Sequence, residues 1–168
     1  MATTTHTQVI NALHGTFTVR DDGGLLPGAS VPPLWENGLV GLAQPSHAYI
    51  ATGTKWGPIR LTVETHDSPP SLAGEWTDIV EVTFAVVSGE VLVADWNGQP
   101  VYELALAPGP VRLRVHTQGR DEGAAVDWEF DDPNPVEEHL LVFFPGEGPT
   151  VVHRSEDRFG RGFRDAPP

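Results

Sequence analysis

Short runs of alternating apolar and polar residues recur along this chain, and no stretch keeps apolar residues at helical spacing for three turns. Eighteen glycines and sixteen prolines separate these runs, and both residue types are poorly tolerated inside helices. The clearest run is 59–65, where Ile, Leu and Val alternate with Arg, Thr and Glu. We therefore predict a mainly β protein with little helix, either an antiparallel β-sandwich or an open barrel of eight to ten short strands.

Two residue pairs mark the turns most clearly. Asn97-Gly98 is the stronger signal, because a type I′ hairpin needs positive φ at both central residues, and we expect it to join the strands that flank it. His14-Gly15 is expected to form a second tight turn between neighbouring strands. Residues 35–42 are the exception to the β pattern, and we predict one or two helical turns there.

Charged residues give three further expectations. One strand alternates Val and Leu with Arg112 and Arg114, so we place both arginines on a solvent-exposed face. Arg120 and Asp121 are expected to form an exposed ion pair where the chain turns, a contact worth roughly 0 to 1 kcal/mol. Residues 158–168 are predicted to be a mobile tail.

The length of 168 residues is typical of one domain, and we expect residues 1–168 to form a single unit. The Gly- and Pro-rich segment 21–33 is too short for an interdomain linker and leaves no room for a domain before it. The first residues lack the basic and apolar stretches of a secretory signal, and the longest apolar run has only five residues. These features predict a cytoplasmic protein without a membrane span.

The chain is strongly acidic, with 23 acidic against 10 basic residues and a formal net charge of −13. Such a charge repels nucleic acid and anionic lipid, so we expect neither as a direct ligand. The same charge attracts basic proteins, although acidity also serves solubility alone in many proteins. The expected partner is therefore a basic protein.

Motifs for catalysis, cofactors and metals are missing from the sequence. The chain has no cysteine, which excludes disulfides and thiolate metal ligands, and its seven histidines lack the spacings of a metal site. Neither G-x-S-x-G, S-x-x-K nor a phosphate-binding loop occurs. We therefore expect a protein that is not an enzyme, with no catalytic residue, no metal and no cofactor.

Five segments of the chain share a pattern with a known family. They are 14–19 (HGTFTV), Trp76 with 79–82 (IVEV), 104–113 (LALAPGPVRL), 119–122 (GRDE) and 137–145 (EEHLLVFFP). Together they resemble the competence protein J family and its uncharacterised actinobacterial relatives. In that family the characterised member is an inhibitor of a DNA-uptake nuclease and binds the enzyme rather than performing chemistry. The resemblance implies a non-catalytic inhibitor or immunity-like partner of a basic nuclease. It carries no specific inhibitory residue over to this chain.

The acidity is densest in residues 127–138, which contain six carboxylates and no lysine or arginine. Pro133 and Pro135 exclude a regular strand, so we expect an acidic loop. In the groove of a nuclease its carboxylates would stand where the DNA phosphates lie, while its aromatic residues anchor the contact. The residues assigned to this contact are Asp127, Trp128, Glu129, Phe130, Asp131, Asp132, Glu137 and Glu138.

Two other functional classes remain open from the sequence. Five tryptophans could form a platform for carbohydrate or a small ligand, which would require a groove lined by two or more of them. An enzyme with an unlocated carboxylate or histidine site would require a buried pair of such groups in a cleft. An inhibitor requires an exposed acidic patch and no deep pocket.

Overall fold

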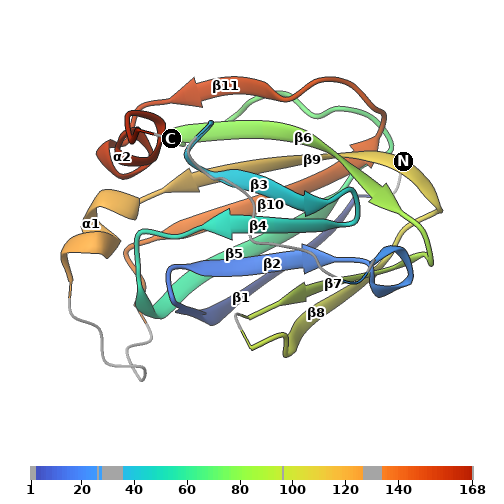
Figure 1. The fold of residues 1–168 in the computed structure, drawn as a ribbon, viewed down its shortest axis with the longest axis horizontal. Coiled ribbons are helices and arrows are strands. Elements are labelled where there is room, and N and C mark those ends of the chain that lie inside the picture. Colours follow the sequence, from blue (N-terminus) through green and yellow to red (C-terminus); the bar gives the residue numbers. More distant parts are fainter. Residues whose placement is uncertain (1–2, 26, 28–35, 96, 127–133, 168) are drawn as a thin grey trace.

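The computed structural model describes residues 3–25, 27, 36–95, 97–126 and 134–167. In these ranges the chain forms eleven strands, two short α-helices and one 3-10 turn (Figure 1). The elements are β1 (Thr4–Leu13), β2 (Thr16–Arg20), η1 (Asp22–Gly24), β3 (Val40–Gln44), β4 (His47–Ala51), β5 (Trp56–Thr65), β6 (Asp78–Val86), β7 (Glu90–Ala94), β8 (Pro100–Ala105), β9 (Gly109–Gln118), α1 (Arg120–Ala125), β10 (Glu138–Pro145), β11 (Val151–Ser155) and α2 (Arg158–Arg164). The prediction of a mainly β protein with little helix is confirmed, with eleven described strands against the eight to ten expected.

The strands belong to one sheet that curls into a half-barrel. Its order is β11-β6-β9-β10-β5-β1-β2-β4-β3, and β7 pairs with β2 and carries β8 on its other side. The described pairs are antiparallel except β10 with β5, which run parallel. Figure 1 shows β3 and β4 in front of β10 and β5, so that the two ends of the sheet approach one another across the core. The architecture is an open barrel, one of the two predicted forms.

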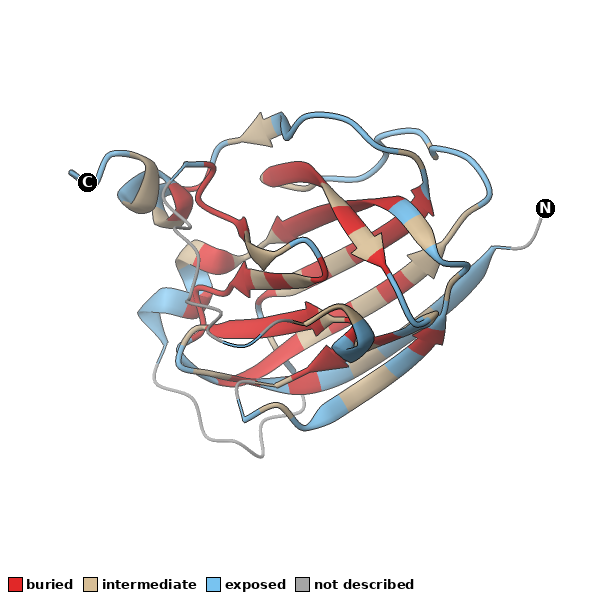
Figure 2. Cartoon of the chain, turned by 45° about the vertical axis from the view of Figure 1, so that its right-hand side comes forward, coloured by how far each residue is buried: buried red, intermediate tan, exposed pale blue. Residues whose placement is uncertain are grey.

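The core fills the concave face of this sheet. Ile59, Leu61 and Val63 of β5 point inward at alternating positions, and each is at most 2% exposed. Leu141 and Phe143 of the neighbouring β10 are fully buried beside them. Figure 2 shows buried residues recurring along the strands in this way. Since burial of such side chains is worth roughly 1.5–3 kcal/mol each, this face stabilises the half-barrel.

The opposite face of β6 and β9 is covered as well. Arg112 and Arg114 are each 5% exposed, and their Nε atoms donate to the two oxygens of Glu81, both at 2.8 Å. Arg112 also donates to the carbonyl groups of residues 148–149, and Arg114 to that of Pro70. The prediction that both arginines face solvent is therefore wrong, because irregular segments from elsewhere in the chain cross over this face.

Both predicted turns form, but one differs in type. His14 and Gly15 have φ values of 56° and 72° and join β1 to β2. The Asn-Gly pair joins β7 to β8, with φ of 79° at Gly98. The Asp95 N–H donates to the Gln99 carbonyl at 3.1 Å, so three positions lie inside the loop. The hairpin is confirmed, whereas the two-residue type I′ turn is wrong.

Two local predictions are also wrong. The segment Val40–Gln44, expected to be helical in part, is β3, because pairing with β4 outweighs its weak local preference. Arg158–Arg164 form α2 rather than a frayed tail, because the Asp157 side chain accepts the Gly160 N–H at 2.7 Å and caps the helix. No helix in the described part of the chain is long and apolar enough to cross a membrane.

Candidate partner-binding surface

Both α-helices lie at one end of the half-barrel, where β9 ends and β10 begins (Figure 1). We call the region formed by residues 118–126, 134–138 and 156–165 the helical end. The acidic stretch is attached there, because α1 precedes it and β10 follows it. Six of the eight predicted contact residues lie outside the described residues, namely Asp127, Trp128, Glu129, Phe130, Asp131 and Asp132.

Arg120 is the central buried charge of the helical end. Its side chain is fully buried, and Nε and Nη2 donate to the two oxygens of Asp157 at 2.6 and 2.8 Å. Nη2 also lies 3.3 Å from Oδ2 of Asp78, and Nη1 donates to the Gly38 carbonyl at 2.7 Å. One guanidinium thus joins α1 to α2, to the start of β6 and to the segment before β3. The predicted exposed pair of Arg120 with Asp121 is wrong.

Asp121 has a different role, which is to hold the first turn of α2. Its carboxylate accepts the backbone N–H groups of Arg158 at 3.1 Å and Phe159 at 2.8 Å. Burial raises the pKa of Asp121, but these two hydrogen bonds and the nearby Arg158 side chain together outweigh that effect and hold the pKa below its usual value. The Arg120 guanidinium lies 5.3 Å from the centre of the Phe159 ring. The two helices therefore form one connected unit.

Glu137, the seventh predicted contact residue, is fully buried. Its Oε1 accepts the Gly53 N–H at 3.0 Å and its Oε2 accepts the Thr54 N–H at 2.7 Å, while His139 Nε2 lies 2.7 Å from Oε1. Burial raises the pKa of Glu137, but the hydrogen bonds from His139 and the backbone lower it overall. This carboxylate binds the connection between β4 and β5, so the expectation that it faces a partner is wrong.

A sequence signal for this burial exists. Extending the alternation of β10 backwards from Leu141 through His139 places Glu137 on the same inner face. The acidic stretch as a whole concealed the signal, because a run of carboxylates is usually solvated. The strand period therefore distinguishes Glu137 from its neighbour Glu138.

Glu138, the eighth predicted contact residue, is partly exposed. Its Oε2 accepts the Gln118 side-chain amide at 3.1 Å, and its Oε1 lies 3.6 Å from Nε of Arg60. Gln118 also lines a cleft of about 420 Å³ at the helical end. The residues around the cleft are Thr77, Gln118, Gly119, Arg120, Asp121, Glu122, Val136 and Asp157. Three carboxylates against one buried guanidinium make this lining acidic.

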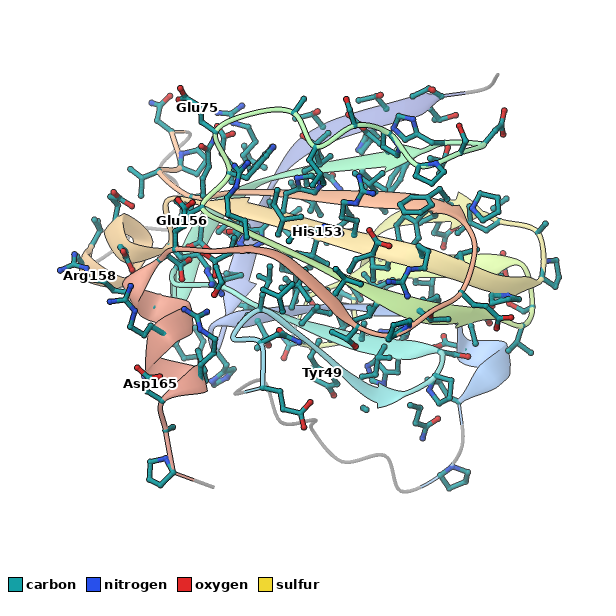
Figure 3. All side chains as sticks on the ribbon, turned by 90° about the horizontal axis from the view of Figure 1, so that it is seen from above. Tyr49, Glu75, His153, Glu156, Arg158 and Asp165 are labelled. Atoms are coloured by element: carbon teal, nitrogen blue, oxygen red, sulfur yellow. The ribbon has the colours of Figure 1, made fainter. Side chains whose placement is uncertain are left out.

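The exposed charges of the described residues are mostly negative. Ten carboxylate side chains are exposed against three basic ones, because three arginines are buried in ion pairs. The exposed acidic residues are Asp22, Glu36, Asp67, Glu75, Glu90, Glu103, Glu122, Glu147, Glu156 and Asp165, and the exposed basic residues are Lys55, Arg158 and Arg161. Figure 3 shows Glu75, Glu156 and Asp165 on the same side of the molecule as α2.

The features required by the other two functional classes are met only in part among the described residues. A groove of about 440 Å³ lies at the far ends of β5 and β10, and none of the described tryptophans lines it. The buried Glu137–His139 pair is the kind of pair an enzyme would need, but its carboxylate already binds two backbone N–H groups. In the described part of the chain no group of three or more His, Asp or Glu side chains is arranged to hold a metal ion.

The comparisons with known proteins concern the fold. No protein-family model and no curated protein matches the chain. Solved structures with a similar fold include ComJ from Bacillus subtilis, inhibitor of the DNA degrading activity of NucA, with a TM-score of 0.60 and 12% identity over 86% of this chain and 98% of ComJ. The crocagin biosynthetic gene J protein has a TM-score of 0.56 and 13% identity over 86% of this chain and 99% of its own. The chain has a ComJ-like fold, which confirms the resemblance at that level.

Proposed function

We propose that this protein is a non-catalytic acidic module that binds and inhibits a basic nuclease through its helical end. The observation that carries the proposal is the excess of ten exposed carboxylates over three exposed basic side chains on a ComJ-like fold. A surface of this charge repels DNA and attracts the basic groove of an enzyme that binds DNA. ComJ itself inhibits a nuclease, which is the activity that this charge distribution suits.

The proposed contact combines the acidic stretch with the exposed carboxylate that precedes it on α1. Its members are Asp127, Trp128, Glu129, Phe130, Asp131, Asp132 and Glu138, with Glu122 of α1 added and Glu137 left out because it is buried. The ion pairs of Arg120 and the backbone contacts of Asp121 hold the base of this surface in place. A base that is fixed before binding loses less entropy on association, which favours a tight complex.

The test measures DNA degradation in the presence of the purified protein. Purified NucA and an extract of the cells that make the protein serve as the two nuclease sources, each at several salt concentrations. We expect inhibition that weakens as the salt concentration rises, because the attraction is between charged surfaces. An unrelated acidic protein of similar size and charge is the control for non-specific effects. Undiminished degradation in both nuclease sources would overturn the proposal.

A further inference from the structure

Trp56 is a large aromatic residue at the surface, four residues before the position of β5 that pairs with the start of β10. It begins β5 and is 40% exposed. Since β5 and β10 are parallel and Glu138 pairs with Arg60, Trp56 lies on the helical-end side of that pair. Exposed tryptophan is uncommon on a free surface and is strongly enriched among residues that dominate binding energy. Trp56 is therefore a candidate anchor for a partner.

His14 lies against the Trp56 ring, with 4.2 Å between ring centres and 62° between ring planes. Its φ of 56° falls in the left-handed region, which is uncommon for any residue other than glycine. Asparagine would suit this place better, since Asn-Gly is the preferred pair in a two-residue hairpin turn. The chain therefore accepts backbone strain at the residue that braces Trp56, and such strain is typical of functional positions.

The same chain segment carries Trp56 and holds the stem of the acidic stretch. The Gly15 N–H donates to the Lys55 carbonyl at 3.0 Å, and the Thr52 N–H donates to the Gly15 carbonyl at 2.8 Å. Glu137 binds the two N–H groups between them, at residues 53–54. The aromatic pair and the start of β10 are consequently fixed to one another through residues 52–56.

We propose that Trp56, braced by His14, is the anchor of the partner contact and receives an arginine or lysine side chain of a basic protein. The indole ring is the best aromatic acceptor for a guanidinium or ammonium group. The excess of exposed carboxylates over the described surface as a whole favours a basic partner over a neutral one. This inference rests on the proposed binding of a basic nuclease and names the residue at its centre.

The test compares four proteins in the inhibition assay with purified NucA and with the nuclease activity of the protein's own cell extract. Trp56→Ala is expected to weaken inhibition by about tenfold or more. His14→Asn is expected to weaken it by about threefold or more while the unfolding temperature stays the same or rises, because Asn relieves the turn. Val87→Ala is the matched control, since Val87 is 49% exposed at the far end of β6, and it should inhibit like the unchanged protein.

Each outcome bears on a different claim. If the unchanged protein and Trp56→Ala both inhibit the nuclease equally well, the anchor is overturned and the proposed function stands. No inhibition by the unchanged protein overturns the proposed function and the anchor with it. A second measurement tests retention of the same proteins on immobilised polysaccharide. If Trp56→Ala inhibits like the unchanged protein but is no longer retained, the ring stacks on sugars and the anchor is overturned. If Trp56→Ala does not fold, Trp56→Phe takes its place and is expected to weaken inhibition by a smaller factor. Inhibition by Trp56→Phe equal to that of the unchanged protein would overturn the anchor.

Discussion

Asp157 accepts two hydrogen bonds from Arg120, at 2.6 and 2.8 Å, and this pair connects α2 to α1 inside the protein. The Arg120 side chain is 0% exposed and that of Asp157 is 3% exposed. Removing one partner of such a pair leaves the other charge buried without compensation, which costs far more than breaking a surface ion pair. The pair therefore provides a direct test of how the helical end is held together.

The substitution Arg120→Met is expected to lower the free energy of unfolding by about 3–5 kcal/mol, because Asp157 loses its buried cation. Urea titration at neutral pH measures the change. Arg158→Met is the matched control, since the Arg158 side chain is 84% exposed and lies 3.5 Å from Asp121. Its expected cost is below about 1 kcal/mol. Equal losses in the two variants would show that the buried network does not stabilise the protein.

The substitution Glu137→Gln is expected to lower the free energy of unfolding by about 1–3 kcal/mol. The amide keeps one acceptor oxygen, but its NH₂ group then faces a backbone N–H and cannot accept from it. Hydrogen exchange should accelerate at the amides of Gly53 and Thr54. Since the pKa of Glu137 is lowered in the folded protein, its contribution is present above the usual carboxyl pKa and is lost as the pH falls from there through the lowered pKa. Glu138→Gln, one residue away and partly exposed, should change stability by less than about 0.5 kcal/mol.

His116 predicts a pH dependence of stability. Its side chain is 2% exposed and packs against Trp76, and its ring nitrogens have no hydrogen-bond partner among the described residues. Burial, together with nearby charges such as that of Arg114, lowers the pKa of His116 from 6.5 to about 4. His116 is therefore protonated near pH 6.5 in the unfolded chain but only near pH 4 in the folded protein.

The sign follows from the extra proton on the unfolded chain. The stability contribution of His116 is complete above pH 6.5 and is lost as the pH falls toward about 4. The loss amounts to about 1.4 kcal/mol per pH unit within that window. His116→Leu should remove this slope, so the stability difference between the two proteins should shift steadily in favour of the variant on acidification. Parallel pH profiles in chemical denaturation would contradict the prediction.

Reversing the charge of Asp127, Glu129, Asp131 and Asp132 to lysine is expected to weaken nuclease inhibition by about tenfold or more and to flatten its salt dependence. The matched control reverses four exposed carboxylates away from the helical end, Asp67, Glu90, Glu103 and Glu147, and changes the net charge by the same amount. We expect a smaller loss from the control. Equal losses would mean that overall charge, not this surface, governs binding.

The alternation of apolar residues was sufficient to predict most strands, because each strand of the half-barrel turns one face to the same core. It could not predict the burial of Arg112 and Arg114, since the segments that cover them lack any periodic pattern and reach them only in the folded chain. The helix α2 was missed for a similar reason. It has seven residues with two glycines, a weak helix by itself, and depends on Asp157 and Asp121.

The candidate partner-binding surface rests in part on the sequence. The acidic stretch was visible there, and six of its eight assigned residues remain predictions. Glu137 was placed wrongly because its partners, the backbone N–H groups of Gly53 and Thr54, are distant in sequence. Trp56 could not be singled out among five tryptophans, since its exposure depends on where β5 begins relative to β10.

The parallel pairing of β10 with β5 has a consequence for how the protein is made. β10 lies between β9 and β5, two strands that are synthesised earlier. Until residues 138–145 leave the ribosome, β5 and β9 each present an open edge that other chains could pair with. Closing the large loop between such distant strands also slows folding. A nascent chain arrested before β10 should therefore be prone to aggregate and dependent on chaperones.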